Sequence, residues 1–146
     1  MLYVDYRVSR KVATLRLGVG SVLPMSTTSI GRAYLWGLPQ KEQQLLIEEF
    51  KRHAGPQGDA LEHAIRASFD ELESSGTCAV QGGFQRGTYG VALPVHIGRQ
   101  GVLMGMSCGN ADVDLDLQAV QERIAPALKE TAVLLQAQLA DSENCL

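Results

Sequence analysis

Two stretches near the middle of the chain alternate small and bulky residues, and they constrain the fold more than any other feature. Residues 88–97 and 101–109 are predicted strands, separated by a turn around Gly98. Successive side chains of a strand point to opposite faces of a sheet, so each strand has a small face and a bulky face. The small faces carry Thr88, Gly90, Ala92, Pro94 and His96, then Gly105, Ser107 and Gly109 next to Leu103. The bulky faces carry Tyr89, Val91, Leu93, Val95 and Ile97, then Val102, Met104, Met106 and Cys108.

The remaining elements follow from hydrophobic periodicity and from breaks at Gly and Pro. Further strands are predicted at residues 2–8, 11–17 and 77–81, and helices at about 30–38, 40–53, 59–75 and 115–140. Gly76 is expected to cap the third helix, and Pro126 is expected to kink the last helix or to mark a late start. This order indicates an α+β domain, in which helices pack on an antiparallel sheet.

Length, charge and cysteine content limit the classes of function. A chain of 146 residues suits one domain. Its net charge of −3, without a basic run, argues against nucleic-acid binding by this chain alone. No apolar run is long enough to span a membrane, and the N-terminus does not resemble a signal peptide. The widely spaced Cys78, Cys108 and Cys145 indicate a reduced, cytoplasmic setting.

The small faces of the two central strands suggest a binding site. If both lie on the same side of the sheet, their short side chains leave a hollow around Gly90, Ser107 and Gly109. A hollow with apolar walls and a few hydroxyl groups is how small-molecule sites are built. The alternative is that a helix packs closely on this glycine-rich surface.

Catalytic and metal-binding patterns are weak. Cys108 and His96 lie on adjacent predicted strands but on opposite faces, which argues against a nucleophilic pair. The alternating polar residues from Asn110 to Asp116 look like the start of a calcium loop, but the required glycine and glutamate are missing. We therefore predict no catalytic group, metal or cofactor. These acids are expected in a turn and at the N-terminus of the last helix, where the helix dipole favours them.

The stretch from Leu23 to Pro39 places four hydroxyl residues, Ser26, Thr27, Thr28 and Ser29, directly before an apolar helix. Serine and threonine side chains satisfy free N–H groups at helix N-termini, so we expect them to cap this helix. Helix N-termini also favour anions, which would suit a carboxylate ligand.

Several motifs resemble one family. GVGSVLPMSTTSIGRAYLWGLP, residues 18–39, resembles the segment of IclR-family transcription regulators that runs Gly-x-x-Leu-Pro-Leu/Met, small residues, Gly-Lys-Ala, Leu-Pro; Arg32 stands where the family usually has Lys. RGTYGVALPV, residues 86–95, is similar to the family's Gly-x-x-x-(Ile/Leu)-Ala-x-Pro-Val, and GVLMGMSCGNA, residues 101–111, looks like its next strand. ELESSGTCAV, residues 71–80, looks like the family's preceding helix end. The motifs cover nearly the whole chain in the right order.

The resemblance implies that residues 1–146 form the C-terminal effector-binding domain of such a regulator. This is a GAF-like α+β domain that senses a small metabolite, forms dimers or tetramers, and is not an enzyme. The family binds DNA through an N-terminal winged helix-turn-helix, which this chain does not contain. The chain is also expected to lack the first helix and strand of the effector domain.

The resemblance also implies the site. The predicted effector-binding residues are Met25, Thr28, Gly31, Val80, Tyr89, Gly90, Ser107 and Gly109. Acid-sensing members have an Asp, a Cys and two hydroxyls where this chain has Val80, Gly90, Ser107 and Gly109, so only Ser107 keeps its polarity. We therefore expect an effector bulkier or more apolar than a two- or three-carbon acid, such as an aromatic carboxylate. Two other functions stay open: a GAF-like oligomerisation module that binds no ligand, and an enzyme using Cys78 or Cys108.

Overall fold

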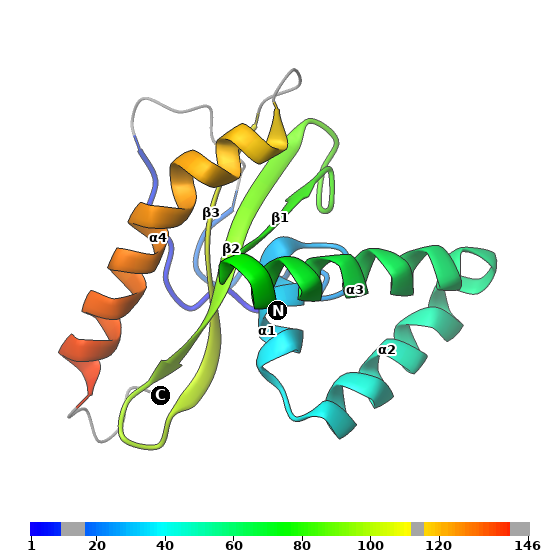
Figure 1. Ribbon diagram of the computed structural model, residues 1–146, viewed down its shortest axis with the longest axis horizontal. Helices are drawn as coiled ribbons and strands as arrows, with labels where there is room; N and C mark the ends of the chain where they lie inside the picture. The colour runs from blue at the N-terminus through cyan, green and yellow to red at the C-terminus, as the bar shows by residue number, and fades with distance from the viewer. Residues whose placement is uncertain (10–16, 112–115, 141–146) are drawn as a thin grey trace.

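Three antiparallel strands form a sheet in the order β1-β2-β3 in the computed structural model, which describes residues 1–9, 17–111 and 116–140 (Figure 1). The elements are α1 (Ser29–Gly37), α2 (Gln40–Ala54), the short 3-10 helix η1 (Gly55–Gln57), α3 (Gly58–Ser75), β1 (Cys78–Gln81), β2 (Thr88–Ile97), β3 (Val102–Ala111) and α4 (Leu117–Leu139). The predicted α+β class is therefore confirmed.

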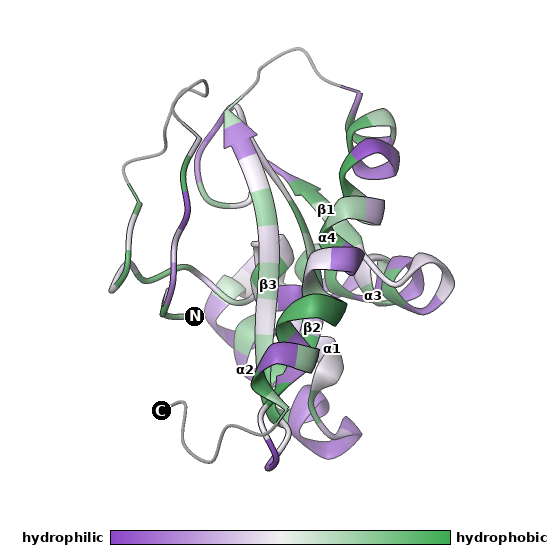
Figure 2. Ribbon diagram, turned by 90° about the vertical axis from the view of Figure 1, so that its left-hand side faces the viewer, coloured by the Kyte–Doolittle hydropathy of each residue, from purple (hydrophilic) through white to green (hydrophobic). Residues whose placement is uncertain are grey.

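The register of β2 and β3 places the two small faces on the same side of the sheet. Gly90 lies opposite Gly109, and Ala92 lies opposite Ser107. β1 adds Cys78 opposite Ala92 to the same side. The pale and green bands along β3 in Figure 2 follow this alternation of small and bulky residues. The predicted division of the strands into small and bulky faces is confirmed.

Each face of the sheet is covered by a different helix. α4 packs on the bulky face, where Leu128 and Ala132 join Val91, Leu93 and Val95 of β2 in one buried cluster. α1 packs on the small face, where its Ile30 and Ala33 are buried with Cys78 and Ala92. The small residues of this face allow α1 to approach closely, because short side chains leave room for a helix backbone.

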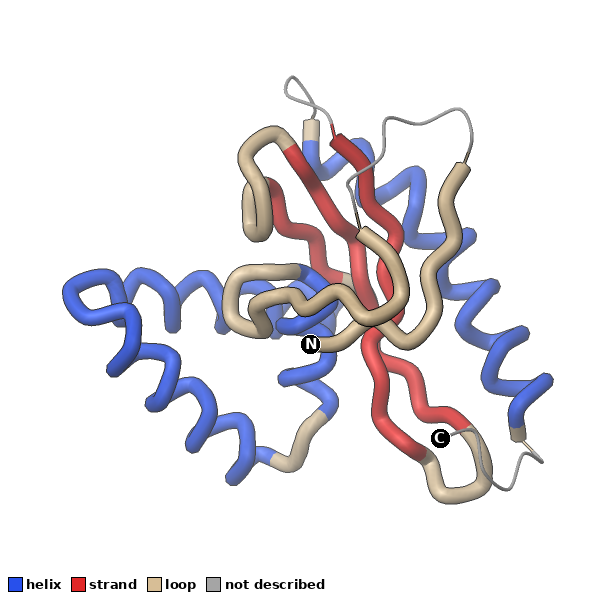
Figure 3. The backbone as a smooth tube through the Cα atoms, turned by 180° about the vertical axis from the view of Figure 1, so that it is seen from behind, coloured by secondary structure: helices blue, strands red, loops and turns tan. Residues whose placement is uncertain are grey.

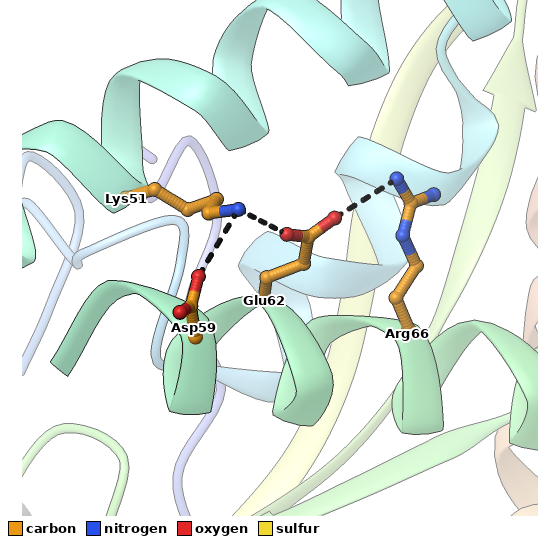
Figure 4. Close-up of polar contacts among 4 residues, drawn as sticks. All are labelled: Lys51, Asp59, Glu62 and Arg66. Carbon is orange, nitrogen blue, oxygen red and sulfur yellow. Dashed lines mark hydrogen bonds and ion pairs between the residues drawn. The ribbon is translucent and has the colours of Figure 1, made fainter.

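Helices α2 and α3 form a hairpin that extends away from the sheet (Figure 1). Its apolar cluster contains Leu35 of α1, Ile47 of α2, and Ile65 and Phe69 of α3. At its far end, Nζ of Lys51 lies 2.6 Å from a carboxylate oxygen of Glu62 and 3.3 Å from one of Asp59, and Arg66 lies 3.4 Å from Glu62 (Figure 4). The hydrogen bond from Lys51 lowers the pKa of Glu62.

The helix termini agree with the predicted capping chemistry in three cases. Thr28 is the N-cap of α1, and its hydroxyl accepts a hydrogen bond from the Gly31 N–H at 3.2 Å. Asp116 caps α4, and Gly76 ends α3 in the left-handed conformation with φ of 74°. α4 runs through Pro126 without interruption, so the predicted late start is wrong. Pro126 lies on the exposed side of α4.

The predicted first strand, residues 2–8, is wrong. Leu2 forms an isolated bridge with Val22, and Tyr3 exchanges backbone hydrogen bonds with Gly20 and Ser21. A strand requires a neighbouring backbone to pair with its N–H and C=O groups, whatever its side-chain pattern. In the described part of the chain, this segment pairs only through its first residues. The predicted strand 11–17 lies outside the described residues except for Leu17, as do the acids of residues 112–115.

Candidate functional site

A cavity of about 1040 Å³ lies along β3, one of the two edge strands of the sheet. Its walls come from the turn before α1, the first turns of α1, the β1–β2 loop and the N-terminal segment, which crosses the strands when the molecule is seen from behind (Figure 3). Residues of both faces of β3 line it. Its volume is at the upper end of the range for small-molecule pockets, roughly 300–1,000 Å³.

The structure brings together the predicted site residues at this cavity, with one exception. The residues that line it are Met25, Thr28, Val80, Tyr89, Gly90, Ser107 and Gly109. The exception is Gly31, which lies beneath the turn rather than on the cavity surface. A Cβ atom at Gly31 would collide with the backbone of Met25, so this glycine allows the turn to fold onto the helix.

Gly90, Gly105 and Gly109 of β2 and β3 form a glycine-rich floor of the cavity. The sequence left open whether this surface forms a hollow or receives a closely packed helix, and the structure shows both. A Cβ atom added at Gly105 would lie 2.7 Å from Cγ1 of Ile30, and one added at Gly90 would lie 2.6 Å from Oγ of Ser29. The floor therefore receives the first turn of α1 in close contact. The same glycines line the cavity beside that turn, so close helix packing and a hollow coexist on one face.

The hydroxyl-rich turn before α1 is held by internal hydrogen bonds. The Thr28 hydroxyl donates to the Pro24 carbonyl at 2.7 Å while it caps the Gly31 N–H. The Arg32 Nε donates to the Ser26 carbonyl at 2.9 Å. The Thr28 hydroxyl therefore has its single proton committed within the protein, and its contribution to the cavity is mainly structural.

Tyr3 is a cavity residue that sequence reasoning missed. Its hydroxyl interacts with that of Ser107, and its ring centroid lies 5.6 Å from that of Tyr6. Burial raises the pKa of Tyr3, and the interaction with the Ser107 hydroxyl partly offsets this rise. Its position in an expected strand gave no sign of this contact, because Ser107 lies more than a hundred residues away in the chain.

The cysteines offer little nucleophilic chemistry. Burial raises the pKa of the Cys78 thiol to about 12, so it is protonated at neutral pH. Cys108 is exposed, and the strand register places it on the opposite face of the sheet from His96. Within the described ranges, no three His, Cys, Asp or Glu side chains gather as a metal site, and no helix is long and apolar enough to cross a membrane.

Comparison with known proteins relates the whole fold to one family. Residues 1–136 match the family described as bacterial transcriptional regulator IclR C-terminal. No curated protein matches the chain in sequence. An IclR family transcriptional regulator from Brucella abortus is similar in structure, with a TM-score of 0.86 and 25% sequence identity over 95% of this chain and 52% of that chain. The chain thus spans about half the length of that regulator.

Two further similar structures hold hydroxybenzoates. One is a double mutant of the PobR transcription factor inducer binding domain from Acinetobacter with 3-hydroxybenzoic acid, with 24% identity and a TM-score of 0.65 over 88% of this chain and 74% of that chain. The other is an IclR homolog from Microbacterium hydrocarbonoxydans with 4-hydroxybenzoate, with 19% identity and a TM-score of 0.66 over 89% of this chain and 52% of that chain. At these identities the likeness concerns the fold.

Proposed function

Because the chain belongs to the IclR family of bacterial transcriptional regulators, matching its C-terminal domain, we propose that it is an effector-binding domain whose ligand alters DNA binding by a longer regulator. One observation carries this proposal. The cavity beside β3 is lined by every predicted effector-binding residue except Gly31, although these residues come from four segments of the chain. Effector binding would act on DNA by favouring one of two arrangements of the regulator.

The cavity chemistry favours an aromatic carboxylate. Apolar side chains such as Ile30, Val80 and Leu103 supply walls that suit a ring. The paired hydroxyls of Tyr3 and Ser107 supply polar groups for a carboxylate or phenol oxygen. The hydroxybenzoates in two structures of similar fold support this class of ligand. Such a domain would have no catalytic role, and since the longer regulator would bind DNA we place it in the cytoplasm.

A thermal-shift screen of benzoates, hydroxybenzoates and small aliphatic acids tests the proposal. A ligand at 100 times its Kd stabilises the folded state by about 2.7 kcal/mol, which raises Tm by roughly 5–10 °C for a chain of this size. Ser107→Phe, which fills the cavity, should abolish the shift. The control Val102→Phe places the same phenylalanine on β3 at a residue that does not line the cavity, and it should keep the shift. Loss of binding in both variants, or no hit with folded protein, would contradict the proposal.

The second candidate function is a ligand-free assembly module. The observation that favours it is a pair of exposed apolar side chains on α4, since 65% of Val133 and 56% of Leu134 are accessible to solvent. Exposed apolar surface of this kind marks many protein interfaces. We propose that the domain forms homo-oligomers in either case. The two functions differ in the thermal-shift screen, because a pure assembly module gives no ligand-dependent shift.

A further inference from the structure

Arg32 is a charged residue that the proposed function does not use directly. It lies in the first turn of α1, its side chain does not line the cavity, and only 9% of the residue is exposed. Among the described residues no carboxylate lies within ion-pair distance of its guanidinium. Burying a charge costs free energy unless hydrogen bonds compensate for the lost hydration. The hydrogen bonds of Arg32 therefore have to stabilise its buried guanidinium.

The partners of Arg32 are uncharged groups on two different elements. On one side, its Nε donates to the Ser26 carbonyl in the turn before α1. On the other side, its Nη1 donates at 3.1 Å to the Ala64 carbonyl and at 3.1 Å to the Ser68 hydroxyl, both on α3. Ser68 is itself only 2% exposed. One rigid, planar guanidinium therefore bridges the turn and α3, which a flexible ammonium could not do with the same fixed geometry.

The turn that Arg32 holds is a wall of the cavity. Met25 and Thr28 line the cavity from this turn. The turn is also confined from both other sides, because Gly31 lies against Met25 and Gly83 of the β1–β2 loop lies against the Thr27 carbonyl. A wall confined in this way has little freedom to shift without moving the groups bonded to it.

α3, at the other side of the bridge, belongs to the hairpin that extends from the body of the molecule (Figure 1). Lys51 on α2 is tied to Glu62 on α3 by the ion pair of Figure 4. A Cβ atom at Gly58 would lie only 2.7 Å from the Lys51 carbonyl, so the two helices meet closely at their junction. A displacement of α3 at Ala64 and Ser68 is therefore shared by α2.

We propose that Arg32 is a positioning residue that locks the cavity wall formed by residues 24–28 to α3, so that occupation of the cavity is coupled to the position of the α2–α3 hairpin. The regulatory meaning of this coupling rests on the proposed function, since it needs a ligand in the cavity. The bridge itself exists without ligand. It makes the hairpin the element through which the cavity communicates with surfaces far from it.

Hydrogen exchange of the unliganded protein tests the bridge. Ser68→Ala removes a partner of Arg32 on α3 without touching the turn, and it should increase the exchange rate of amides in residues 25–32 about fivefold, as expected for one hydrogen bond. Arg32→Met, which keeps the aliphatic stem, should increase exchange both there and at residues 64–68. Ser68→Ala should add nothing further to exchange in the turn once Arg32 is Met. Arg32→Lys should restore part of the protection.

Two controls keep the test specific. Ser74→Ala removes an exposed hydroxyl that bonds only within α3, and Arg66→Met removes an exposed arginine from the same helix. Both should leave exchange in the turn unchanged. Far-UV circular dichroism and melting curves establish that every variant is folded. The bridge is overturned if Ser68→Ala leaves the turn unaffected, or if its effect persists undiminished in Arg32→Met.

A ligand arm separates the coupling from the proposed function. With 4-hydroxybenzoate as the probe, exchange at residues 64–68 should slow in the wild-type protein and should not change in Arg32→Met. Equal slowing in both proteins would overturn the coupling. Failure of the wild-type protein to bind 4-hydroxybenzoate or the other acids of the screen would count against the proposed function alone. The exchange rates of the unliganded variants would still show whether Arg32 links the turn to α3.

Discussion

At the scale of single residues, the site depends on a few polar groups set in apolar walls. Ser107 keeps the polarity that the family resemblance implies, and Tyr3 supplies a second hydroxyl beside it. Two adjacent hydroxyls have two protons, so even when one is shared between them the other is free for an acceptor on the ligand. We therefore expect the two residues together to bind an anionic oxygen more tightly than Ser107 alone.

Tyr3→Phe should weaken binding of hydroxybenzoates about tenfold, because it removes one hydrogen bond to a charged ligand, worth roughly 1.5 kcal/mol or more. The ring and its contact with Tyr6 remain, so folding should not change. Isothermal titration gives the affinity. Tyr6→Phe is the matched control, and equal affinities for Tyr3→Phe and the wild-type protein would contradict this role.

Cys78 gives a prediction for how the stability of the protein depends on pH. Burial raises the pKa of Cys78 to about 12, above the ordinary thiol value of 9.0. Between these values the unfolded chain loses the thiol proton while the folded chain keeps it, so the free energy of unfolding falls as pH rises. The stability that Cys78 contributes is fully present below pH 9 and is lost as pH approaches 12. Urea unfolding from pH 8 to 11 should show a shallower decline for Cys78→Ala than for the wild-type protein.

Alkylation of the native protein provides an independent check on Cys78. Iodoacetamide at pH 8 should modify the exposed Cys108 and leave Cys78 unmodified, as measured by mass spectrometry of peptides. Urea should make Cys78 reactive. Rapid modification of Cys78 in the folded protein would contradict the raised pKa.

At the scale of elements, the placement of α1 decides the shape of the cavity. The helix begins at Ser29 because Thr28 caps it, and the turn before it folds back over Gly31. The small face of the sheet then receives Ile30 against Gly105. Capping, a glycine in the first turn and a glycine in the strand thus act together to bring the helix N-terminus to the cavity.

Gly31→Ala should therefore destabilise the protein by about 1–3 kcal/mol, the usual cost of overpacking, because its Cβ would meet backbone atoms of Met25 that cannot move aside easily. Urea denaturation measures the change. Gly18→Ala is the matched control, since a Cβ there meets nothing within 4 Å. Similar stabilities for the two variants would show that the turn yields at low cost.

At the scale of the whole molecule, two surfaces stand apart from the cavity. One is the α2–α3 hairpin, which Arg32 joins to the cavity wall. The other is the exposed side of α4, which presents Val133 and Leu134 away from the sheet. An effector domain that acts on a longer regulator needs such surfaces, because ligand binding has to be read out at a distance from the pocket.

Replacement of both Val133 and Leu134 by Glu should shift the protein from oligomer to monomer, since charges in an apolar interface would be desolvated without partners. Size-exclusion chromatography with light scattering measures the mass. Gln138→Glu, on an exposed position of the same helix, should leave the mass unchanged. An unchanged oligomer in the double variant would place the interface elsewhere.

Local sequence determined the helices, the three strands of the sheet and part of the candidate site. Periodicity and capping residues located α1 to α4 within one or two residues, because these signals act over a few neighbours. The alternation in β2 and β3 defined their faces, and it indicated a hollow at Gly90, Ser107 and Gly109. Family resemblance added Met25 and Val80.

Only the tertiary structure decided the rest. It determined that residues 2–8 are not a regular strand, that Tyr3 meets Ser107, and that Gly31 supports the turn instead of lining the cavity. It also revealed that Arg32 bridges the turn and α3. Apart from the contact of Gly31 with the nearby turn, these features depend on residues distant in the chain, whose approach is set by packing of the whole core. A periodic pattern predicts which face of an element a side chain lies on. Which distant residue that side chain contacts depends on the tertiary structure.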